Sequence, residues 1–532
     1  MEYLLNSEQM KAVDQYSIHK IGIPSVVLME RAAYTVSELV KARAFVAYAG
    51  VNEWVDSAAI REVRKPKILC MSGRGNNGAD GLAVARHLMQ AGCQVDVMCL
   101  GNDQAASTDE YKIQRNILFN MDANIIECVQ QEEYDYIVDA IFGVGLSRTV
   151  EGEYAKAIEL VNGIKKNHPS TVIVSVDIPS GINATDGSVM GTAVKADCTV
   201  TFGYKKLGMM LNPGAEYTGE IITADIGFAE VSVSELGGDY VAYTYALEDV
   251  KNVPKRGDNI NKGDCGKVLV VAGSADMGGA AAMSAAGAYR SGAGLVKVFT
   301  HSNNRELLLK YVPEAVALTY GSELTEQDKD SLKNACKWAD CVVVGPGLSQ
   351  SEDAKAILDT VIKSTDNTCI IVDADGLNLI ASDRTHYDKL FKTRPHNTVI
   401  ITPHMGEMSR LTGASIEELK RRPIESARGL AGTMNCVCVL KDAKTVVTDS
   451  SNVYVNTTGN GGMATAGAGD VLTGVLAGML TAGFGNVMDA TTMAVNIHGC
   501  AGDMCKECKG SRSMKAWDIV ESLPRIYKYS EV

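Results

Sequence analysis

Short, continuous apolar segments alternate with longer segments of helical periodicity twice along the chain. Such segments are typical of strands buried on both faces of a parallel sheet, and their alternation with helices indicates an α/β fold. In the first half we expect helices at 7–20, 24–42, 81–91 and 154–166, and strands at 67–72, 94–100, 136–140, 171–177, 198–202 and 220–225. In the second half we expect strands at 267–272, 295–300, 341–345, 369–373, 398–402 and 437–441, then an antiparallel hairpin of 445–448 and 453–456 near a sheet edge.

The strand pattern stops between residues 227 and 250, where a glycine pair and a charged stretch interrupt it. A chain of 532 residues is too long for one hydrophobic core. We therefore predict two α/β domains, residues 1–235 and 236–532, the first a Rossmann-like three-layer α/β/α domain. Open sheets of this kind bind ligands at the carboxyl ends of their strands, where many of the 51 glycines fall.

The formal net charge of −13 argues against non-specific nucleic-acid binding, which needs a basic surface. The N-terminus lacks a secretory signal and no long apolar run occurs, so we expect a cytoplasmic protein that does not bind membranes. The 14 cysteines are scattered, which indicates free thiols in a reducing compartment. A zinc site at Cys505 and Cys508, near His498, is the less favoured alternative because a second ligand pair is missing.

Residues 460–470 read Asn-Gly-Gly-Met-Ala-Thr-Ala-Gly-Ala-Gly-Asp and lead into an apolar helix expected at 471–482. A glycine-rich loop before a helix presents backbone N–H groups, and the helix dipole adds positive charge, so the segment predicts phosphate binding. A carboxylate placed there suits a base that activates a hydroxyl for phosphoryl transfer, which makes Asp470 a catalytic candidate. The alternative, that Asp470 only caps the helix, does not explain the small residues before it.

This run resembles the Gly-Ala/Thr-Gly-Asp signature of the ribokinase-like superfamily and, more narrowly, its branch of ADP- or ATP-dependent NAD(P)HX dehydratases. Similar motifs of that branch extend over residues 250–530: Gly273-Ser274 with Gly278-Gly279-Ala280, then Arg-Ser-Gly-Ala-Gly-Leu-Val at 290–296, Val-Gly-Pro-Gly-Leu at 344–348, Asp-Ala-Asp-Gly-Leu-Asn at 373–378 and Thr-Pro-His-Met-Gly-Glu at 402–407. Together the motifs are highly specific, and they imply a ribokinase-like C-terminal α/β domain.

The resemblance implies that the hydroxyl of a hydrated nicotinamide ring is phosphorylated and that phosphate is then eliminated, with Mg²⁺ bridging the phosphates of ADP or ATP. Asp470 would activate the hydroxyl, and the amides of Ala468 and Gly469 would stabilise the phosphoryl group. The implied substrate-binding residues are Ala280, Gly347, His404 and Asp470, and the implied nucleotide-binding residues are Lys441, Asp442, Ala443, Lys444, Thr445 and Gly469.

Some of these assignments have alternatives. His404 could be a core histidine, and Asp373 and Asp375 could be helix caps or structural charges. The family usually has Lys-Gly-x-x-Thr where this chain places Asp442 at the glycine position, so the preference between ADP and ATP stays open.

In the first half, residues 73–81 read Gly-Arg-Gly-Asn-Asn-Gly-Ala-Asp-Gly and follow the strand expected at 67–72. They contain Gly-x-Gly-x-x-Gly, the dinucleotide-binding pattern. A hydride-transfer domain is nevertheless the minority interpretation. The usual ribose-binding acid ends the second strand, whereas Asp96 falls inside the strand expected at 94–100.

Residues 76–81 resemble the Asn-Asn-Gly-Gly-Asp-Gly run of NAD(P)HX epimerases, with Ala79 in place of a glycine. The segments 139–146, 176–181, 186–187 and 202–208 are similar to the later motifs of that family, so the resemblance covers about residues 1–230. It implies a potassium ion held by Asn77, Asp139 and Ser180, whose oxygen ligands suit a hard cation. The implied substrate-binding residues are Asn76, Asn77, Gly78, Ala79, Asp80, Gly143, Val144, Gly145, Leu146, Ser147, Arg148, Thr149 and Asp177.

Asp177 is the residue expected to transfer the proton at the epimerising carbon, with strand-end capping the alternative for both Asp139 and Asp177. The two halves together resemble bifunctional NAD(P)H-hydrate repair enzymes. That resemblance implies epimerisation of R- and S-NAD(P)HX by the first half and dehydration of the S form by the second. NADHX, NADPHX and ADP or ATP are the expected small-molecule partners, and we expect a homo-oligomer. The alternatives are a vitamin or sugar kinase in the second half and a non-catalytic binding module in the first.

Overall fold

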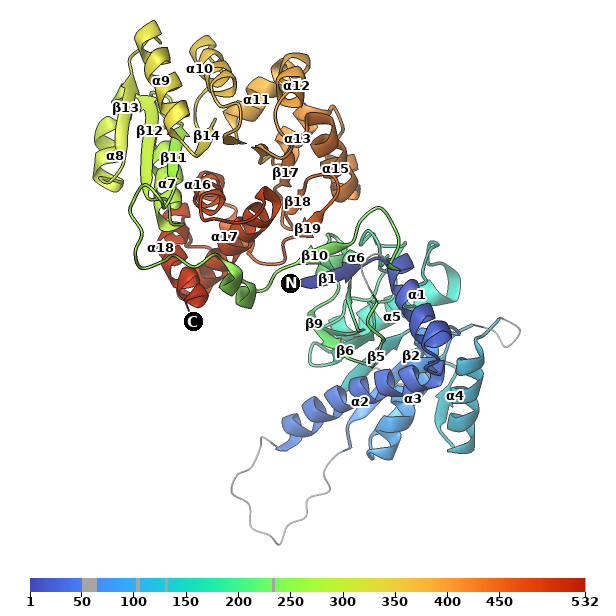
Figure 1. Ribbon diagram of the computed structural model, residues 1–532. Helices are drawn as coiled ribbons and strands as arrows, with labels where there is room; N and C mark the ends of the chain where they lie inside the picture. The colour runs from blue at the N-terminus through green and yellow to red at the C-terminus, as the bar shows by residue number, and fades with distance from the viewer. Residues whose placement is uncertain (50–64, 102–105, 130–132, 232–234, 532) are drawn as a thin grey trace, which may run out of the picture. The chain divides into compact units, whose positions relative to one another are not determined.

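The computed structural model describes residues 1–49, 65–101, 106–129, 133–231 and 235–531 (Figure 1). The chain forms two compact units. One comprises residues 3–241, and the other comprises residues 242–532 together with Met1 and Glu2. Each unit contains an open, largely parallel sheet, so the predicted α/β class is confirmed for both halves.

The sheet of the N-terminal unit is parallel and has the order β4-β3-β2-β5-β6-β7-β9. The order reverses between β2 and β5, and open sheets of this kind usually bind ligands outside the carboxyl ends of the strands at such a point. The strands are β2 (Lys67–Ser72), β3 (Gln94–Cys99), β4 (Asn124–Ile126), β5 (Tyr136–Ala140), β6 (Val172–Val176), β7 (Cys198–Phe202) and β9 (Glu220–Ala224). The helices around them are α1 (Ser7–Gln15), α2 (Ser25–Ala49), α3 (Asn76–Gln90), α4 (Asp109–Asn120) and α5 (Gly152–Asn167).

Both faces of this sheet are covered by helices. Ile68 and Cys70 of β2 lie in a core with α2, α3 and α4, whereas Leu69 and Met71 lie in a second core with α5. Side chains alternate between the two faces of a strand, so one apolar run serves two cores. The predicted three-layer α/β/α arrangement is therefore confirmed. The short strand β4 was not predicted, because two of its three residues are exposed.

Helix α3 begins five residues earlier than the sequence indicated, so the expected loop at 73–81 ends at Gly75. Gly75 is the extended N-cap residue, with φ −89° and ψ −170°. A Cβ at Gly78 would lie 1.9 Å from the carbonyl oxygen of Gly73. This close packing of the first helical turn on the end of β2 explains the glycine without requiring a longer loop.

A small parallel pair lies beside the main sheet of this unit. Strand β1 (Glu2–Leu5) pairs with β8 (Lys205–Lys206), and Leu5 lies opposite Lys206. Helix α6 (Leu207–Met210) follows directly and is buried. This pair fixes the backbone of the lysine-containing turn that the sequence placed at 202–208.

The sheet of the C-terminal unit has the order β13-β12-β11-β14-β15-β16-β17-β18-β19-β10. It is parallel from β13 to β17, antiparallel from β17 to β19, and parallel again between β19 and β10. The order reverses between β11 and β14, so the general rule for open sheets predicts the ligand site at the carboxyl ends of these two strands. The strands are β10 (Ala242–Thr244), β11 (Lys267–Val271), β12 (Leu295–His301), β13 (Val316–Tyr320), β14 (Cys341–Val344), β15 (Cys369–Val372), β16 (Val399–Ile401), β17 (Val437–Leu440), β18 (Val446–Thr448) and β19 (Val453–Val455).

The antiparallel hairpin predicted at 445–456 is confirmed as β18 and β19. Strand β13 was missed because most of its residues are only half-buried. The helices of this unit are α7 (Gly278–Arg290), α8 (Arg305–Tyr311), α9 (Glu326–Trp338), α10 (Glu352–Lys363), α11 (Asp375–Ser382), α12 (Arg384–Lys392), α13 (Met405–Thr412), α14 (Ile416–Arg421), α15 (Pro423–Met434), α16 (Ala468–Leu480), α17 (Val487–Lys509) and α18 (Ala516–Tyr527).

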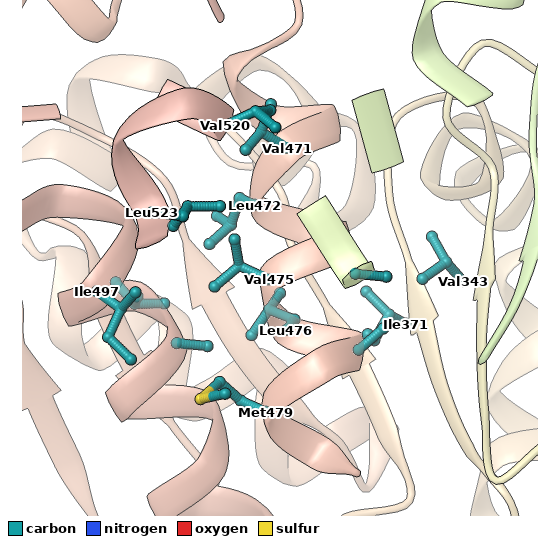
Figure 2. Close-up of a cluster of buried hydrophobic side chains, with 14 of the residues drawn as sticks. Val343, Ile371, Val471, Leu472, Val475, Leu476, Met479, Ile497, Val520 and Leu523 are labelled. Atoms are coloured by element: carbon teal, nitrogen blue, oxygen red, sulfur yellow. The ribbon is translucent and has the colours of Figure 1, made fainter. Parts of the chain in front are cut away.

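Helix α16 is the central helix of this core. Figure 2 shows its apolar side chains between Val343 and Ile371 of β14 and β15 on one side and Ile497, Val520 and Leu523 of α17 and α18 on the other. Most residues of α16 are apolar and buried, so the helix is held by core packing around its circumference and not by a single apolar stripe. The start of α16, which carries the glycine-rich loop, is therefore rigidly positioned above the sheet. In the described part of the chain, no helix combines the length and apolarity required to cross a membrane.

Candidate active sites

The parallel strands of the C-terminal sheet end side by side along one edge of the sheet. Their register aligns Val271 with Val344, Val344 with Val372, and Val372 with Ile401. One step further, His404 and Lys441 form a parallel bridge. The residues that follow these strands in the sequence, at 273, 345–347, 373, 402–404 and 441, therefore share one edge of the sheet. This alignment explains why motifs far apart in the sequence form one site.

The glycine-rich loop is anchored from behind by α17. Asp503 accepts hydrogen bonds from the Gly459 amide at 2.7 Å and from the Asn460 side chain at 2.9 Å, and Asn460 also donates to the Gly502 carbonyl. Gly467 has φ +92°, a conformation that favours glycine, and it immediately precedes the first residue of α16. The Ala468 amide donates to the Thr465 carbonyl at 3.3 Å, and the helix dipole makes this helix start favourable for an anion.

Asp470 lies in the first turn of α16, next to a buried ion pair. Lys441 donates to Asp373 at 2.6 Å, and Thr402 donates to the same carboxylate oxygen at 2.7 Å. A Cβ built on Gly469 would lie 3.4 Å from the Lys441 ammonium, so this pair is adjacent to the glycine-rich loop. Asp373 is 2% exposed and directly follows β15.

The electrostatics of this group favour a base that works near neutral pH. Burial raises the pKa of Asp470 to about 7, with the Asp373 charge adding to the rise and Lys441 opposing it. Burial lowers the pKa of Lys441, but the carboxylates of Asp373 and Glu407 outweigh it, and the net shift is upward. Lys441 is therefore a fixed cation, whereas Asp470 changes charge in the physiological range.

The predicted substrate residues lie on the same rim. The Ser274 amide donates to the Gly347 carbonyl at 2.6 Å, and a Cβ on Gly347 would lie 3.1 Å from that of Ala280. His404 is more than half exposed, so the alternative of a core histidine is wrong. Its Nδ1 accepts from the Gly406 amide at 2.9 Å, and Glu407 accepts from the His404 amide, which fixes the ring at the start of α13.

The residues of the segment at 441–445 differ in their surroundings. Lys441 is the cation of the ion pair with Asp373, whereas Asp442 and Ala443 are exposed in the turn that leads into β18. Burial lowers the pKa of Lys444, and the charge of Asp503 opposes this shift, so Lys444 lies near the anchor of the glycine-rich loop. Thr445 closes the turn by donating to the Asp442 carbonyl at 3.3 Å.

His498 lies on α17 behind the same loop and was not assigned to this site from the sequence. Burial lowers its pKa to about 4, so the imidazole is neutral. Its Nε2 has no hydrogen-bond partner among the described residues. Within the same part of the chain, no three His, Cys, Asp or Glu residues are grouped closely enough to hold a metal ion. Cys505 instead contacts Ser522 at 3.1 Å, and Cys508 is exposed.

In the N-terminal unit, three predicted residues meet where β5 ends. Asp139 is fully buried and accepts hydrogen bonds from the Ser180 amide at 2.9 Å and from Ser175 at 2.7 Å. The Ser180 hydroxyl donates to Asp139 at 2.5 Å and accepts from the Phe142 amide at 2.8 Å. Asn77 donates to the Phe142 carbonyl at 3.0 Å, so Asn77, Asp139 and Ser180 surround one backbone turn.

The remaining predicted residues border this turn. A Cβ on Gly143 would lie 3.1 Å from the Asn77 side chain, which brings the loop after β5 against the start of α3. Gly145, Ser147, Arg148 and Thr149 are exposed. Asn76 is exposed as the first residue of α3, whereas Gly78 and Ala79 are buried against the sheet. Burial raises the pKa of the Asp80 carboxyl strongly, and the charge of Asp177 adds to the rise.

Asp177 follows β6 and is 9% exposed, with a left-handed φ of 68°. Its carboxylate accepts from the Phe202 amide at 3.2 Å and forms an ion pair with Lys206, which is fully buried. The sequence included Lys206 in a motif but gave it no role. Its neighbour Lys205 has the same charge, and only the β1–β8 register shows which of the two points inward.

These features define a class of protein: an α/β enzyme with a phosphoryl-transfer site in one unit and a separate oxygen-lined site in the other. A family model described as NAD(P)H-hydrate dehydratase matches residues 268–525, and one described as YjeF-related protein N-terminus matches residues 25–208. The bifunctional NAD(P)H-hydrate repair enzyme of Thermofilum pendens is 34% identical over 97% of this chain and 94% of its own length. That of Escherichia coli K12 is also 34% identical, over 88% and 86%.

A solved structure is similar as well. The ADP/ATP-dependent NAD(P)H-hydrate dehydratase from Bacillus subtilis, co-crystallised with ATP/Mg²⁺, is 31% identical with a TM-score of 0.46 and covers 53% of this chain and 96% of its own. The chain belongs to the family of bifunctional NAD(P)H-hydrate repair enzymes. Its N-terminal unit is the epimerase domain, and its C-terminal unit is the NAD(P)H-hydrate dehydratase domain.

Proposed function

We propose that Asp470 is the base of the dehydratase reaction. It accepts the proton of the ring hydroxyl while the hydroxyl oxygen attacks the terminal phosphoryl group of ADP or ATP. A phosphate ester forms as the bond from that phosphorus to the bridging oxygen breaks, and AMP or ADP leaves. The ring C–O bond then breaks, its electron pair leaves with phosphate, and loss of a proton from the neighbouring ring carbon restores the double bond. The observation that carries this proposal is a carboxyl with a pKa of about 7 in the first turn of α16.

The surrounding residues supply charge stabilisation and positioning. The amides of Ala468 and Gly469 would bind the phosphoryl group, and residues 441–445 would border the nucleotide. The buried carboxylates Asp373 and Glu407 are oxygen ligands of the type that Mg²⁺ takes, and Mg²⁺ would neutralise the phosphate charge. Ala280, Gly347 and His404 would contact the hydrated nucleotide. Asp442 is exposed in its turn, and either ADP or ATP is proposed as the phosphate donor.

The variant Asp470→Asn tests this role in the full-length protein. Formation of NADH from S-NADHX should fall by a factor of about 10²–10⁴, the usual contribution of a general base. Binding of the adenine nucleotide should persist within a few-fold. Asp489→Asn, which changes a first-turn carboxylate of the neighbouring helix α17, is the matched control and should stay active. Equal loss of turnover and nucleotide binding in Asp470→Asn would show that Asp470 is structural.

We further propose that Asp177 transfers the proton at the epimerising carbon. Inversion of a carbon that carries a hydroxyl requires bonds there to open and reclose, and a carboxylate that removes and returns a proton serves both directions. Residues 76–80 and 143–149 would hold the phosphates and the hydrated ring of the substrate. The burial of Asp177 beside a cation supports this assignment.

A potassium ion is proposed between Asn77, Asp139 and Ser180. These residues fit a hard cation, because they offer only oxygen as the ligand atom and Asp139 brings a buried negative charge. Burial raises the pKa of Asp139, and hydrogen bonds from Ser180 and Ser175 only partly offset this rise. A bound cation would stabilise the ionised form and the turn at Phe142.

The cellular context of the enzyme is also proposed. We infer that it works in the cytoplasm as a homo-oligomer, with domains divided at residues 235 and 236, and that it binds neither nucleic acid nor membranes. The net charge of −13 and the absence of a membrane-crossing helix from the described residues support this setting. Sedimentation of the purified chain, with and without added DNA, tests both the oligomer and the lack of nucleic-acid binding.

A further inference from the structure

Lys206 is buried in the N-terminal unit with its charge directed at a single carboxylate. Its side chain has no exposed surface, and its ammonium group contacts Asp177 Oδ1, the Thr201 hydroxyl at 2.8 Å and the Phe202 carbonyl at 3.1 Å. A fully buried lysine is rare unless it is paired, because removing an ammonium from water is costly. Burial of Lys206 therefore costs desolvation free energy, which indicates that the charge has a functional role at this position.

All three N–H donors of the Lys206 ammonium have acceptors within the protein. An ammonium has three donors and no acceptor, so no donor remains for a substrate. Asp177 Oδ1 is in turn occupied by Lys206 and by the Phe202 amide. The other carboxylate oxygen, Oδ2, is thus the atom left to meet the substrate.

Acidic side chains also lie near Asp177. Asp80 on α3 and Asp14 on α1 both have a pKa raised by burial, and the charge of Asp177 is the next contribution for each. Glu110 on α4 adds further negative charge to both. Burial lowers the pKa of Lys206, and Asp177 opposes this shift. Lys206 is thus the cation that contacts Asp177 in a surrounding that also holds acidic side chains.

We propose that Lys206 is the positioning residue of the epimerase site: its ion pair fixes the Asp177 carboxylate through Oδ1 and aims Oδ2 at the epimerising carbon. This inference rests on the proposed role of Asp177. The β1–β8 pair supports it, because the register with Leu5 directs Lys206 inward. The left-handed φ of Asp177, uncommon for a residue other than glycine, is held by the same contacts. Lys206 acts through Asp177 and does not touch the substrate.

The test follows the exchange of R- and S-NADHX by the full-length protein without ADP or ATP, so that the dehydratase stays silent. Lys206→Met should move the acidic limb of the rate–pH profile to higher pH by about 1–3 units, the effect of one nearby charge on a carboxyl group. The rate above that limb should stay within about tenfold of the wild type, because the base itself is intact. Lys206→Arg, which keeps the charge, should leave the limb near its original position.

Lys205→Met removes an identical charge one residue away and is the matched control, with no expected shift. If Lys206→Met does not fold, Lys206→Gln provides the same neutral substitution with a retained hydrogen-bond donor. A loss of rate at every pH with an unmoved limb would overturn the inference, because Lys206 would then be structural or a direct proton donor. Asp177→Asn separates the two claims. Full epimerase activity of Asp177→Asn would refute the role of Asp177. If Asp177→Asn is inactive but the acidic limb of Lys206→Met does not move, only the role of Lys206 is refuted.

Discussion

Replacement of Asp373 by Asn should shift the pH dependence of dehydration to lower pH. Asp470 must be ionised to act as a base, and burial with the nearby Asp373 charge raises its pKa to about 7. At that pKa about a tenth of Asp470 is ionised at pH 6. Because Asp470 keeps some contact with solvent, we take the low end of the effect of a neighbouring charge, about one unit. The ionised fraction at pH 6 then rises to about one half, roughly a fivefold gain.

The assay is kcat/KM for S-NADHX between pH 5 and 9, with each variant compared with its own high-pH plateau. Normalisation separates the electrostatic effect from any loss of Mg²⁺ or nucleotide binding. Thr402→Val is the control, because it removes a hydrogen bond to Asp373 without changing a charge, and its midpoint should stay near that of the wild type. An unchanged or higher midpoint for Asp373→Asn would refute the assignment of this limb to Asp470.

Three further outcomes are expected. Lys441→Met should move the same limb to higher pH, opposite to Asp373→Asn, because the cation that lowers the pKa of Asp470 is lost; coincident shifts would contradict the charge model. Asp139→Asn should abolish activation of epimerisation by K⁺ in a salt titration, while Ser175→Ala, which removes one hydrogen bond to Asp139, should retain it. Gly474→Ala should lower the free energy of unfolding by about 1–3 kcal/mol through overpacking, because its Cβ would lie 2.1 Å from the Ser284 carbonyl oxygen where α16 crosses α7; denaturant unfolding with an unchanged midpoint would refute this packing.

The strands were predicted well because parallel strands buried on both faces carry a continuous apolar signal. Strand β2 serves two cores through its alternating side chains, and its sequence shows this directly. Strands β4 and β13 lack that signal because they lie at sheet edges and are partly exposed. The start of α3 was placed too late, since glycines that usually end helices here permit close packing on the end of β2.

The candidate sites were partly predictable. Asp470 and Asp177 could be selected from their motifs, but their electrostatic partners could not. The pairing of Asp373 with Lys441 joins two strand ends 68 positions apart, and it depends on the register of the sheet. The choice of Lys206 over Lys205 depends on which face of a two-residue strand points inward. Sequence motifs identify reactive groups, whereas long-range packing decides which charges tune them.

The central claim is that Asp470 serves only the dehydratase half of a two-step repair. The most direct measurement follows an equal mixture of R- and S-NADHX in the presence of Mg²⁺ and ADP or ATP, for the wild type and for Asp470→Asn. The wild type should convert both epimers completely to NADH. Asp470→Asn should form almost no NADH yet still interconvert the epimers at the wild-type rate. Full NADH formation by Asp470→Asn, or a stable phosphorylated product from the wild type, would contradict the account.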